Sequence, residues 1–364
     1  MPYDEVIIII NILLVLFAVL LFGMIIFIHE FGHFFTAKLS GIRVNEFAVG
    51  MGPTLFHVQK GETQYSLRLL PIGGYCAMEG EDESSEDEHA FNNKPVWKRI
   101  IVVCAGAVMN ILLGIVLMMI LLGQQPAFTS TTVSQFAKDS ALQSAGLKEG
   151  DRFYSVDGYR VFTDRDLSFA LGTANAASVD IAVVRGKEKL FFHDVKMNTR
   201  EYNGKPALVL DFYVKPIHKN PWTLLAKSGA DTVSTVRLVW YSLVGLVTGR
   251  FGMNDMAGPV GAASAISQAA SAGLKEGLLP AVNNILLMMM MITVNLGVVN
   301  LMPFPALDGG RLVFLLVEAV RGKPVNPKYE GWVHATGFAL LMALMLIVTY
   351  SDILRLFTGK GLGG

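Results

Sequence analysis

The run from Val6 to Ile28 constrains this chain more than any other feature, because about 23 residues follow one another without an ionisable side chain. At about 1.5 Å per helical residue, this length crosses the hydrocarbon core of a bilayer. Further apolar runs follow at 100–122, 281–300 and 333–350. With 52% hydrophobic and 16% charged residues, the chain is too apolar for a soluble protein. We therefore predict an α-helical membrane protein with four transmembrane helices.

A cluster of ionisable residues stands directly behind the first run, in His29-Glu30-Phe31-Gly32-His33. Ionisable groups inside a membrane are costly, so three of them within five positions indicate function rather than packing. On a helix the two histidines, four positions apart, share one face and can bind a single zinc ion. Glu30 lies beside them as the candidate general base. The pattern is typical of a metallopeptidase.

The end of the third span supplies a candidate for the third zinc ligand, Asp308. Pro303 and Pro305 precede it and two glycines follow it, so we expect irregular backbone here. Spans one and three run in the same direction, and residues at similar depths can therefore meet. Two imidazoles and one carboxylate leave one position on zinc open for water, as in catalytic sites. Glu30 would take a proton from that water and pass it to the leaving amine.

The regions between the spans divide the chain into four parts. Residues 1–126 hold spans one and two, with a membrane-associated β-hairpin built from Leu55–Val58 and Thr63–Leu70. Residues 127–214 have the composition of one small soluble α+β domain. Residues 215–280 form an interfacial amphipathic segment, and residues 281–364 hold spans three and four. The acidic run at 79–88 is interpreted as a solvated loop without an assigned function.

The distribution of charge predicts the orientation in the membrane. Lys38 and Arg43 follow the first span and Lys98 and Arg99 precede the second, and the positive-inside rule puts such residues in the cytoplasm. Both chain termini and the domain at 127–214 then lie outside. The formal net charge of zero gives no electrostatic case for nucleic-acid binding. The expected partners are the lipid bilayer and transmembrane protein substrates.

Cleavage of a transmembrane helix requires local unwinding, because the helix holds its carbonyl groups in i to i−4 hydrogen bonds. We predict that a strand edge near Tyr65–Leu69 captures the unwound segment by strand addition. Asn110, Asn295 and Asn300 offer amides to the freed substrate backbone. For Asn110, four residues after Gly106, hydrogen bonding between helices is the alternative that the sequence leaves open.

These motifs resemble those of the site-2 protease family of intramembrane zinc metallopeptidases, particularly the bacterial branch that cleaves anti-sigma factors. The pentapeptide at 29–33 matches the family's HExxH. Asn300 to Gly309 matches NxxPxPxLDG, whose aspartate is the family's third zinc ligand. Gly106 to Asn110 matches GxxxN, which the family uses in substrate handling. The stretch from Gly50 to Gly74 resembles the membrane-reentrant β-loop, with Met51 where phenylalanine is usual.

The domain at 127–214 resembles a bacterial PDZ domain, with Gly146 and Leu147 near the position of the peptide-binding loop. The resemblance implies a multi-pass zinc endopeptidase of the bacterial inner membrane. Such an enzyme makes the second cut in single-span proteins already trimmed by another protease. The resemblance also implies removal of signal-peptide remnants. A membrane metal-binding or transport protein without peptidase activity is the alternative, in which the histidines and Asp308 would be transit ligands.

Overall fold

The structure, a computed structural model, describes residues 3–81, 83, 85–175, 177–202, 205–252 and 256–358. The chain forms two compact units. The helical unit consists of the described residues up to Leu117 and from Val239 onward, and the β-rich unit is Met118–Leu238. Each unit has its own core of buried apolar side chains.

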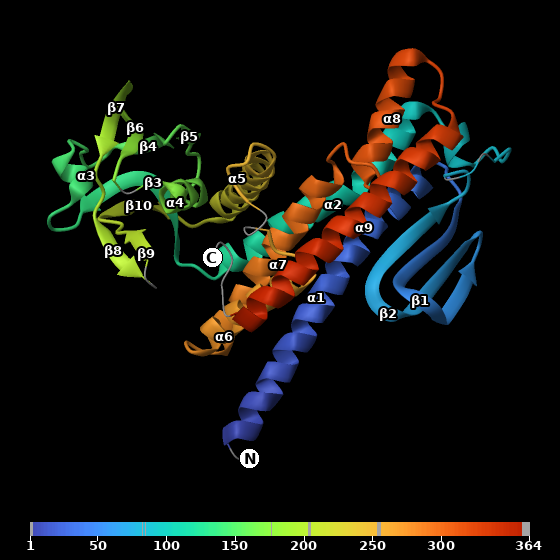
Figure 1. The fold of residues 1–364 in the computed structure, drawn as a ribbon, viewed down its shortest axis with the longest axis horizontal. Coiled ribbons are helices and arrows are strands. Elements are labelled where there is room, and N and C mark those ends of the chain that lie inside the picture. The colour runs from blue at the N-terminus through green and yellow to red at the C-terminus, as the bar shows by residue number, and fades with distance from the viewer. Residues whose placement is uncertain are drawn as a thin grey trace. The chain divides into compact units, whose positions relative to one another are not determined.

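Long helices dominate the helical unit, where they run roughly along one direction (Figure 1). They are α1 (Tyr3–Leu39), α2 (Val96–Gly123), α6 (Pro259–Leu274), α7 (Leu278–Asn300), α8 (Asp308–Arg321) and α9 (Pro327–Thr358), with a short 3₁₀ turn η1 at Phe91–Asn93 before α2. Among the described residues, α1, α2, α7 and α9 contain stretches long and apolar enough to cross a membrane. The prediction of four helices long and apolar enough to span a bilayer is thus confirmed. Because α1 continues to Leu39, the HExxH motif lies inside a regular helix.

A long hairpin of β1 (Val44–Lys60) and β2 (Thr63–Met78) lies beside α1 (Figure 1). It extends well beyond the two short strands that the sequence predicted. The pairing is irregular, since Ala48 pairs with Tyr75 and also with Ser66. Glycines at 50, 52 and 73 have positive φ angles, which let the two strands bend back on themselves.

This double pairing moves the free strand edge away from its predicted position. Tyr65, Ser66 and Leu67 each have a partner on both sides, so the prediction of an open edge at Tyr65–Leu69 is wrong for these residues. The residues at 74–78 pair with β1 on one side only, as far as the described backbone extends. The part of the hairpin that folds back, from residue 51 to residue 70, exposes a group of apolar side chains: Met51, Leu55, Phe56, Val58, Leu67, Leu69 and Leu70. A patch of this kind marks contact with a membrane or a partner.

A polar cluster ties the bent hairpin together. The carboxylate of Glu46 accepts hydrogen bonds from the hydroxyl of Tyr75, at 2.5 Å, and from the guanidinium of Arg68, at 2.9 Å. Burial opposes ionisation of Glu46, but hydrogen bonds from Ser66, Tyr75 and Arg68 outweigh it and lower the pKa to about 2. Desolvation and the bond to Glu46 raise the pKa of Tyr75 to about 12. Glu46 therefore stays ionised and Tyr75 stays neutral over the physiological pH range.

The β-rich unit is built around a mainly antiparallel sheet in the order β10-β3-β4-β6-β7, with β5 paired to β4 and with a separate hairpin of β8 and β9. The strands are β3 (Ala127–Phe136), β4 (Arg152–Val156), β5 (Tyr159–Arg160), β6 (Val179–Arg185), β7 (Glu188–Val195), β8 (Thr199–Tyr202), β9 (Lys205–Leu208) and β10 (Phe212–His218). Two short helices, α3 (Ala141–Ser144) and α4 (Asp164–Thr173), accompany the sheet. Strand β10 continues four residues past 214, the predicted end of the domain. The PDZ-like character of this unit stays a prediction.

Helix α5 (Pro221–Val247) has a buried polar side and an exposed apolar side, the reverse of a helix in a soluble protein. Buried Lys227 pairs with Asp231 at 2.6 Å and with Asp164 of α4. In contrast, Trp222 is 80% exposed and Val233 is 57% exposed. The interfacial position of residues 215–280 stays a prediction, in which these exposed apolar side chains would enter the lipid boundary.

Candidate metal centre

His29 and His33 lie one turn apart on α1 and turn their imidazoles toward the same point. Their Nε2 atoms are 3.3 Å apart, and both side chains are buried. Two glycines allow α2 to approach them. A Cβ atom at Gly32 would lie 2.6 Å from the carbonyl oxygen of Ala105, and one at Gly106 would lie 2.3 Å from Nε2 of His33. A side chain at Gly106 would therefore fill the space beside the imidazole nitrogens.

Asp308 reaches the histidines from the first residue of α8, after the irregular loop that follows α7. The two glycines behind it let α8 begin directly on this loop, since a Cβ at Gly309 would lie 2.0 Å from the carbonyl oxygen of Met302. Ala306 has a φ of +75°, a strained value for a residue with a side chain. Its backbone N–H donates to Nδ1 of His334 at 3.0 Å. Helix α9 thereby holds the loop that aims Asp308.

The three predicted ligands converge on one point. Oδ2 of Asp308 is 3.3 Å from Nε2 of His29 and 3.4 Å from Nε2 of His33. A tetrahedral zinc ion with ligands at about 2.0–2.1 Å has ligand-to-ligand distances of about 3.3–3.4 Å. The same Oδ2 atom is buried and has no hydrogen-bond donor in the described structure, as expected of an atom whose partner is a cation. The residues thus fit a zinc site.

Glu30, next to His29 on α1, lies against the hairpin. A Cβ atom at Gly74 of β2 would lie 3.3 Å from Cγ of Glu30. The one-sided strand segment at 74–78 therefore begins directly beside the candidate general base. Gly74 was not singled out as a site residue by the sequence, because only the pairing of the strands reveals which residues border Glu30.

The three predicted asparagines have different surroundings. Nδ2 of Asn300 is 3.2 Å from Nε2 of His29, so Asn300 borders the cluster. Asn110 is fully buried, with Nδ2 3.2 Å from Nδ1 of the same histidine. Asn295 is exposed on α7, while Thr293 and Gly297 of that helix face α2. The structure does not bring Asn295 to the cluster.

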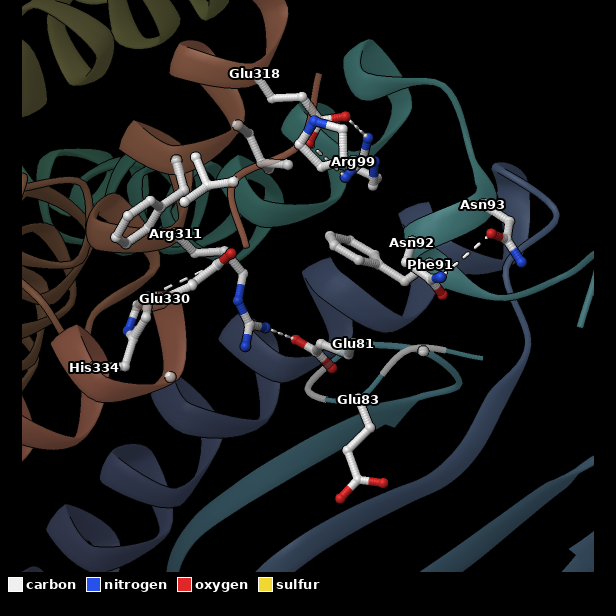
Figure 2. A pocket seen from close by; sticks show the side chains of 16 residues that line it. Glu81, Glu83, Phe91, Asn92, Asn93, Arg99, Arg311, Glu318, Glu330 and His334 are labelled. Carbon is white, nitrogen blue, oxygen red and sulfur yellow. Dashed lines mark hydrogen bonds and ion pairs between the residues drawn. The ribbon is translucent and has the colours of Figure 1, made fainter. Parts of the chain in front are cut away.

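A cavity of about 620 Å³ lies beside α8, where Arg311, Phe314 and Glu318 line it (Figure 2). Arg311, one turn after Asp308, pairs with Glu81 of the acidic run, and Arg99 of α2 pairs with Glu318 (Figure 2). These pairs fasten α8 to α2 and to the end of β2. Glu81 is therefore part of a packed polar contact, whereas the sequence predicted a solvated loop. An arginine one turn from a predicted ligand was the signal that could have indicated this contact.

In the loop with Gly146 and Leu147, the backbone N–H groups already donate hydrogen bonds within the β-rich unit. The N–H of Gly146 donates to Gln143, that of Leu147 to Leu142, and that of Lys148 to the carboxylate of Asp151. The carbonyl of Gly146 accepts a bond from Arg185 at 3.0 Å. A contact of Gly146 and Leu147 with peptide ends stays a prediction, and these two residues present no unbonded N–H group for it.

Comparisons with known proteins agree with this site. A model of peptidase family M50 matches residues 17–344. A protein of Clostridium acetobutylicum named as a zinc metalloprotease is 38% identical over 342 residues, which cover 93% of this chain and 97% of that protein. The regulator of sigma-W protease RasP of Bacillus subtilis is 31% identical over 421 aligned positions, with 93% and 98% coverage. The zinc metalloprotease RasP of Bacillus licheniformis is 30% identical with the same coverage.

The matches extend over the whole site, from the histidines of α1 to the aspartate that begins α8. They confirm the predictions of a zinc-dependent endopeptidase and of zinc as its metal. The four apolar helices agree with a multi-pass membrane protein. The chain therefore belongs to peptidase family M50, the site-2 protease family of zinc metallopeptidases.

Proposed function

We propose that this protein hydrolyses peptide bonds within or near the transmembrane segments of single-span membrane proteins. One observation carries the proposal: the ligand atoms of His29, His33 and Asp308 are spaced as zinc requires, and Glu30, next to His29, borders a one-sided strand. Long apolar helices hold these residues, which supports a site within membrane depth.

The chemistry of the site divides between the ligands and Glu30. The two imidazoles and the carboxylate of Asp308 would hold zinc, which when bound supplies a Lewis acid for the scissile carbonyl and for water. Glu30 accepts a proton from the attacking water and holds it on its carboxyl group. It then delivers this proton to the nitrogen of the leaving amine, which completes hydrolysis. Asn300, beside His29, can donate an amide hydrogen to the substrate backbone.

Strand addition to β2 explains how a helical substrate reaches this site. A segment that unwinds loses its i to i−4 hydrogen bonds and needs new backbone partners in the membrane. The residues at 74–78 have one side without a strand partner, next to Glu30. A substrate paired there would have its backbone satisfied and one carbonyl directed to the metal centre. This edge replaces the one predicted near Tyr65–Leu69.

The charge pattern supports an orientation with the active site toward the cytoplasmic half of the bacterial inner membrane. Basic residues precede or follow the apolar spans at one end of the helical unit: Lys38, Arg43, Lys94, Lys98, Arg99, Arg321, Lys323 and Lys328. The positive-inside rule assigns this end to the cytoplasm. The PDZ-like β-rich unit and both termini are then extracytoplasmic.

The substrate classes follow from the relatives. One of them is named a regulator of sigma-W protease, which supports anti-sigma factors, after a first extracytoplasmic cut, as substrates of this protein. Signal-peptide remnants are the second class, because they are single apolar segments of the same kind.

Purified full-length protein in detergent should cleave such segments only with its metal and with Glu30. A panel of single-span substrates would be incubated with and without a chelator, and with the variants Glu30→Gln and Glu188→Gln. Glu188 is an exposed carboxylate of β7 and serves as the matched control. We expect Glu30→Gln to retain zinc and lose cleavage, and Glu188→Gln to keep both. Turnover by zinc-loaded Glu30→Gln would contradict the proposed role.

A further inference from the structure

One face of α2 forms the wall behind both histidines. Val102, Gly106 and Asn110 are spaced four residues apart, so they line up along the same side of the helix. Gly106 in the middle leaves room for the imidazoles, because a Cβ there would lie 2.7 Å from Cε1 of His29 and 2.3 Å from Nε2 of His33. The residues one turn before and one turn after the glycine can then reach the far nitrogen of each ring.

The first of these contacts sets the tautomer of His33. Its Nδ1 lies 2.9 Å from the carbonyl oxygen of Val102. A carbonyl oxygen only accepts hydrogen bonds, so Nδ1 must carry the hydrogen and donate it. Nε2 of His33 then keeps its lone pair and faces Asp308 and His29. This is the form of an imidazole that can bind a cation.

The second contact involves His29 and the side-chain amide of Asn110. Nδ1 of His29 lies 3.2 Å from Nδ2 of the amide group. Asn110 is 0% exposed, and its Oδ1 has no hydrogen-bond partner in the described structure. The oxygen and nitrogen of an amide have the same shape, and their assignment follows from the hydrogen bonds that each choice satisfies.

The two orientations of Asn110 have opposite consequences for the metal centre. With Nδ2 toward the ring, Nδ1 of His29 must accept, so the hydrogen sits on Nε2 and blocks the ligand atom. With Oδ1 toward the ring, Nδ1–H donates to it, the buried Oδ1 gains its missing partner, and Nε2 is free. Only the second orientation agrees with the convergence of Nε2 on His33 and Asp308.

We propose that Asn110 is a positioning residue of the metal centre, whose Oδ1 accepts the Nδ1–H of His29 and thereby fixes the tautomer and ring direction of that ligand. The inference rests on the proposed zinc chemistry of His29, His33 and Asp308. It assigns Asn110 to the support of a ligand, whereas the sequence suggested contact with substrate. The backbone of Val102 does the same for His33, which explains why an asparagine is needed only at one end of this face.

Zinc affinity of the full-length protein tests the proposal independently of cleavage. Asn110→Leu has a similar volume without an acceptor, and Asn110→Asp keeps the acceptor. Thr293→Val is the matched control, because buried Thr293 donates its hydroxyl hydrogen to the backbone oxygen of Asn110 rather than to the amide side chain. In competition with a chelator we expect Asn110→Leu to bind zinc about 10–100-fold more weakly, the usual effect of losing such a partner. Asn110→Asp and Thr293→Val should stay close to the wild type.

Two outcomes would overturn the proposal. If Asn110→Leu binds zinc like the wild type but cleaves less, Asn110 acts on substrate. If Asn110→Asp loses as much zinc affinity as Asn110→Leu, the acceptor is not what matters. Absence of zinc binding in the wild type would instead refute the proposed function itself.

A measurement on the unmodified side chain covers the case in which Asn110→Leu does not fold. Nitrogen NMR of metal-free protein with labelled histidine reports which ring nitrogen carries hydrogen, and a His29→Gln sample identifies the signal. We expect His29 to carry its hydrogen on Nδ1. Hydrogen on Nε2 would contradict the proposal.

Discussion

Two aspartates, the half-buried Asp308 of the helical unit and the buried Asp166 of the β-rich unit, show opposite surroundings for a carboxylate oxygen that is shielded from water. Asp166 is 1% exposed and accepts bonds from the backbone N–H groups of Phe162 and Thr163, from the hydroxyl of Ser234 and from Arg237. Asp308 points a buried Oδ2 at two imidazole nitrogens and accepts no hydrogen bond there. A buried carboxylate oxygen with hydrogen-bond donors stabilises the fold, whereas one without donors indicates a binding site for a cation.

The difference begins in the local sequence. Asp166 completes a capping box with Thr163 at the start of α4, so the neighbouring residues Phe162 and Thr163 already provide its two backbone donors. Asp308 follows a loop that is strained at Ala306 and is held by residues of α9. We infer that substitutions at the two aspartates separate function from stability.

The largest effect is expected for Asp308→Asn. The amide keeps the size of the side chain but loses its negative charge, so zinc should dissociate and cleavage should fall to background. Unfolding of the protein in denaturant should be nearly unchanged, because no hydrogen bond to Oδ2 is lost. Zinc content and cleavage of the purified variant check this. A marked loss of stability with zinc retained would contradict the assignment of Asp308 to metal binding rather than to stability.

Gly106→Ala should affect the same site by a steric route. The added Cβ would lie within 3 Å of Nε2 of both histidines, so the imidazoles must turn away and zinc affinity should fall by about 100-fold or more. Gly123→Ala is the control on the same helix, since a Cβ at Gly123 meets nothing within 4 Å. Equal zinc affinities of the two variants, measured by chelator competition, would show that α2 can move aside.

Asp166→Ala should produce the reverse pattern in the β-rich unit. Several buried donors, among them the guanidinium of Arg237, would lose their acceptor, which should lower the free energy of unfolding by about 3 kcal/mol. Faster hydrogen exchange of α4 and the adjoining part of α5 would report the loss. Zinc content should remain that of the wild type, and a loss of zinc would show that the two aspartates are coupled.

The smallest effect concerns the hairpin, where the carboxylate of Glu46 has hydrogen-bond donors, as that of Asp166 has. Because the pKa of Glu46 falls from its ordinary 4.5 to about 2 in the folded protein, its contribution to stability is present above pH 4.5 and is lost as the pH falls toward 2. Tyr75→Phe removes one donor to Glu46 and should move this loss to higher pH, by less than about one unit. Hydrogen exchange of the hairpin between pH 5 and 3 measures the shift. An unchanged profile would show that Tyr75 does not support the carboxylate.

The three proposed metal ligands could be predicted from the sequence because each depends on a short-range pattern. Histidines four apart meet on any helix, and the prolines and glycines around Asp308 identify irregular backbone at the end of a span. The strand edge beside Glu30 could not be predicted, since it results from residues 46–49 pairing with two separate parts of β2. That pairing depends on the whole hairpin, and its exposed apolar side chains hide the usual alternation.

Contacts between helices could not be predicted from the sequence either. The spacing of Gly106 and Asn110 predicted a close approach of two helices, but it could not show that imidazoles occupy the space. Residues 215–280 were predicted as an interfacial amphipathic segment, and the sequence could not show that the buried side of α5 within it is the polar one. The loop at Gly146 was assigned by position alone, and its hydrogen bonds became visible only in the structure.

X-ray absorption at the zinc edge of purified full-length protein tests the account most directly. If His29, His33 and Asp308 hold the metal, the spectrum will contain two imidazole rings and only nitrogen or oxygen ligands, at about 2.0–2.1 Å. A sulfur ligand at about 2.3 Å, or a zinc ion without imidazole, would contradict the assignment of these three residues.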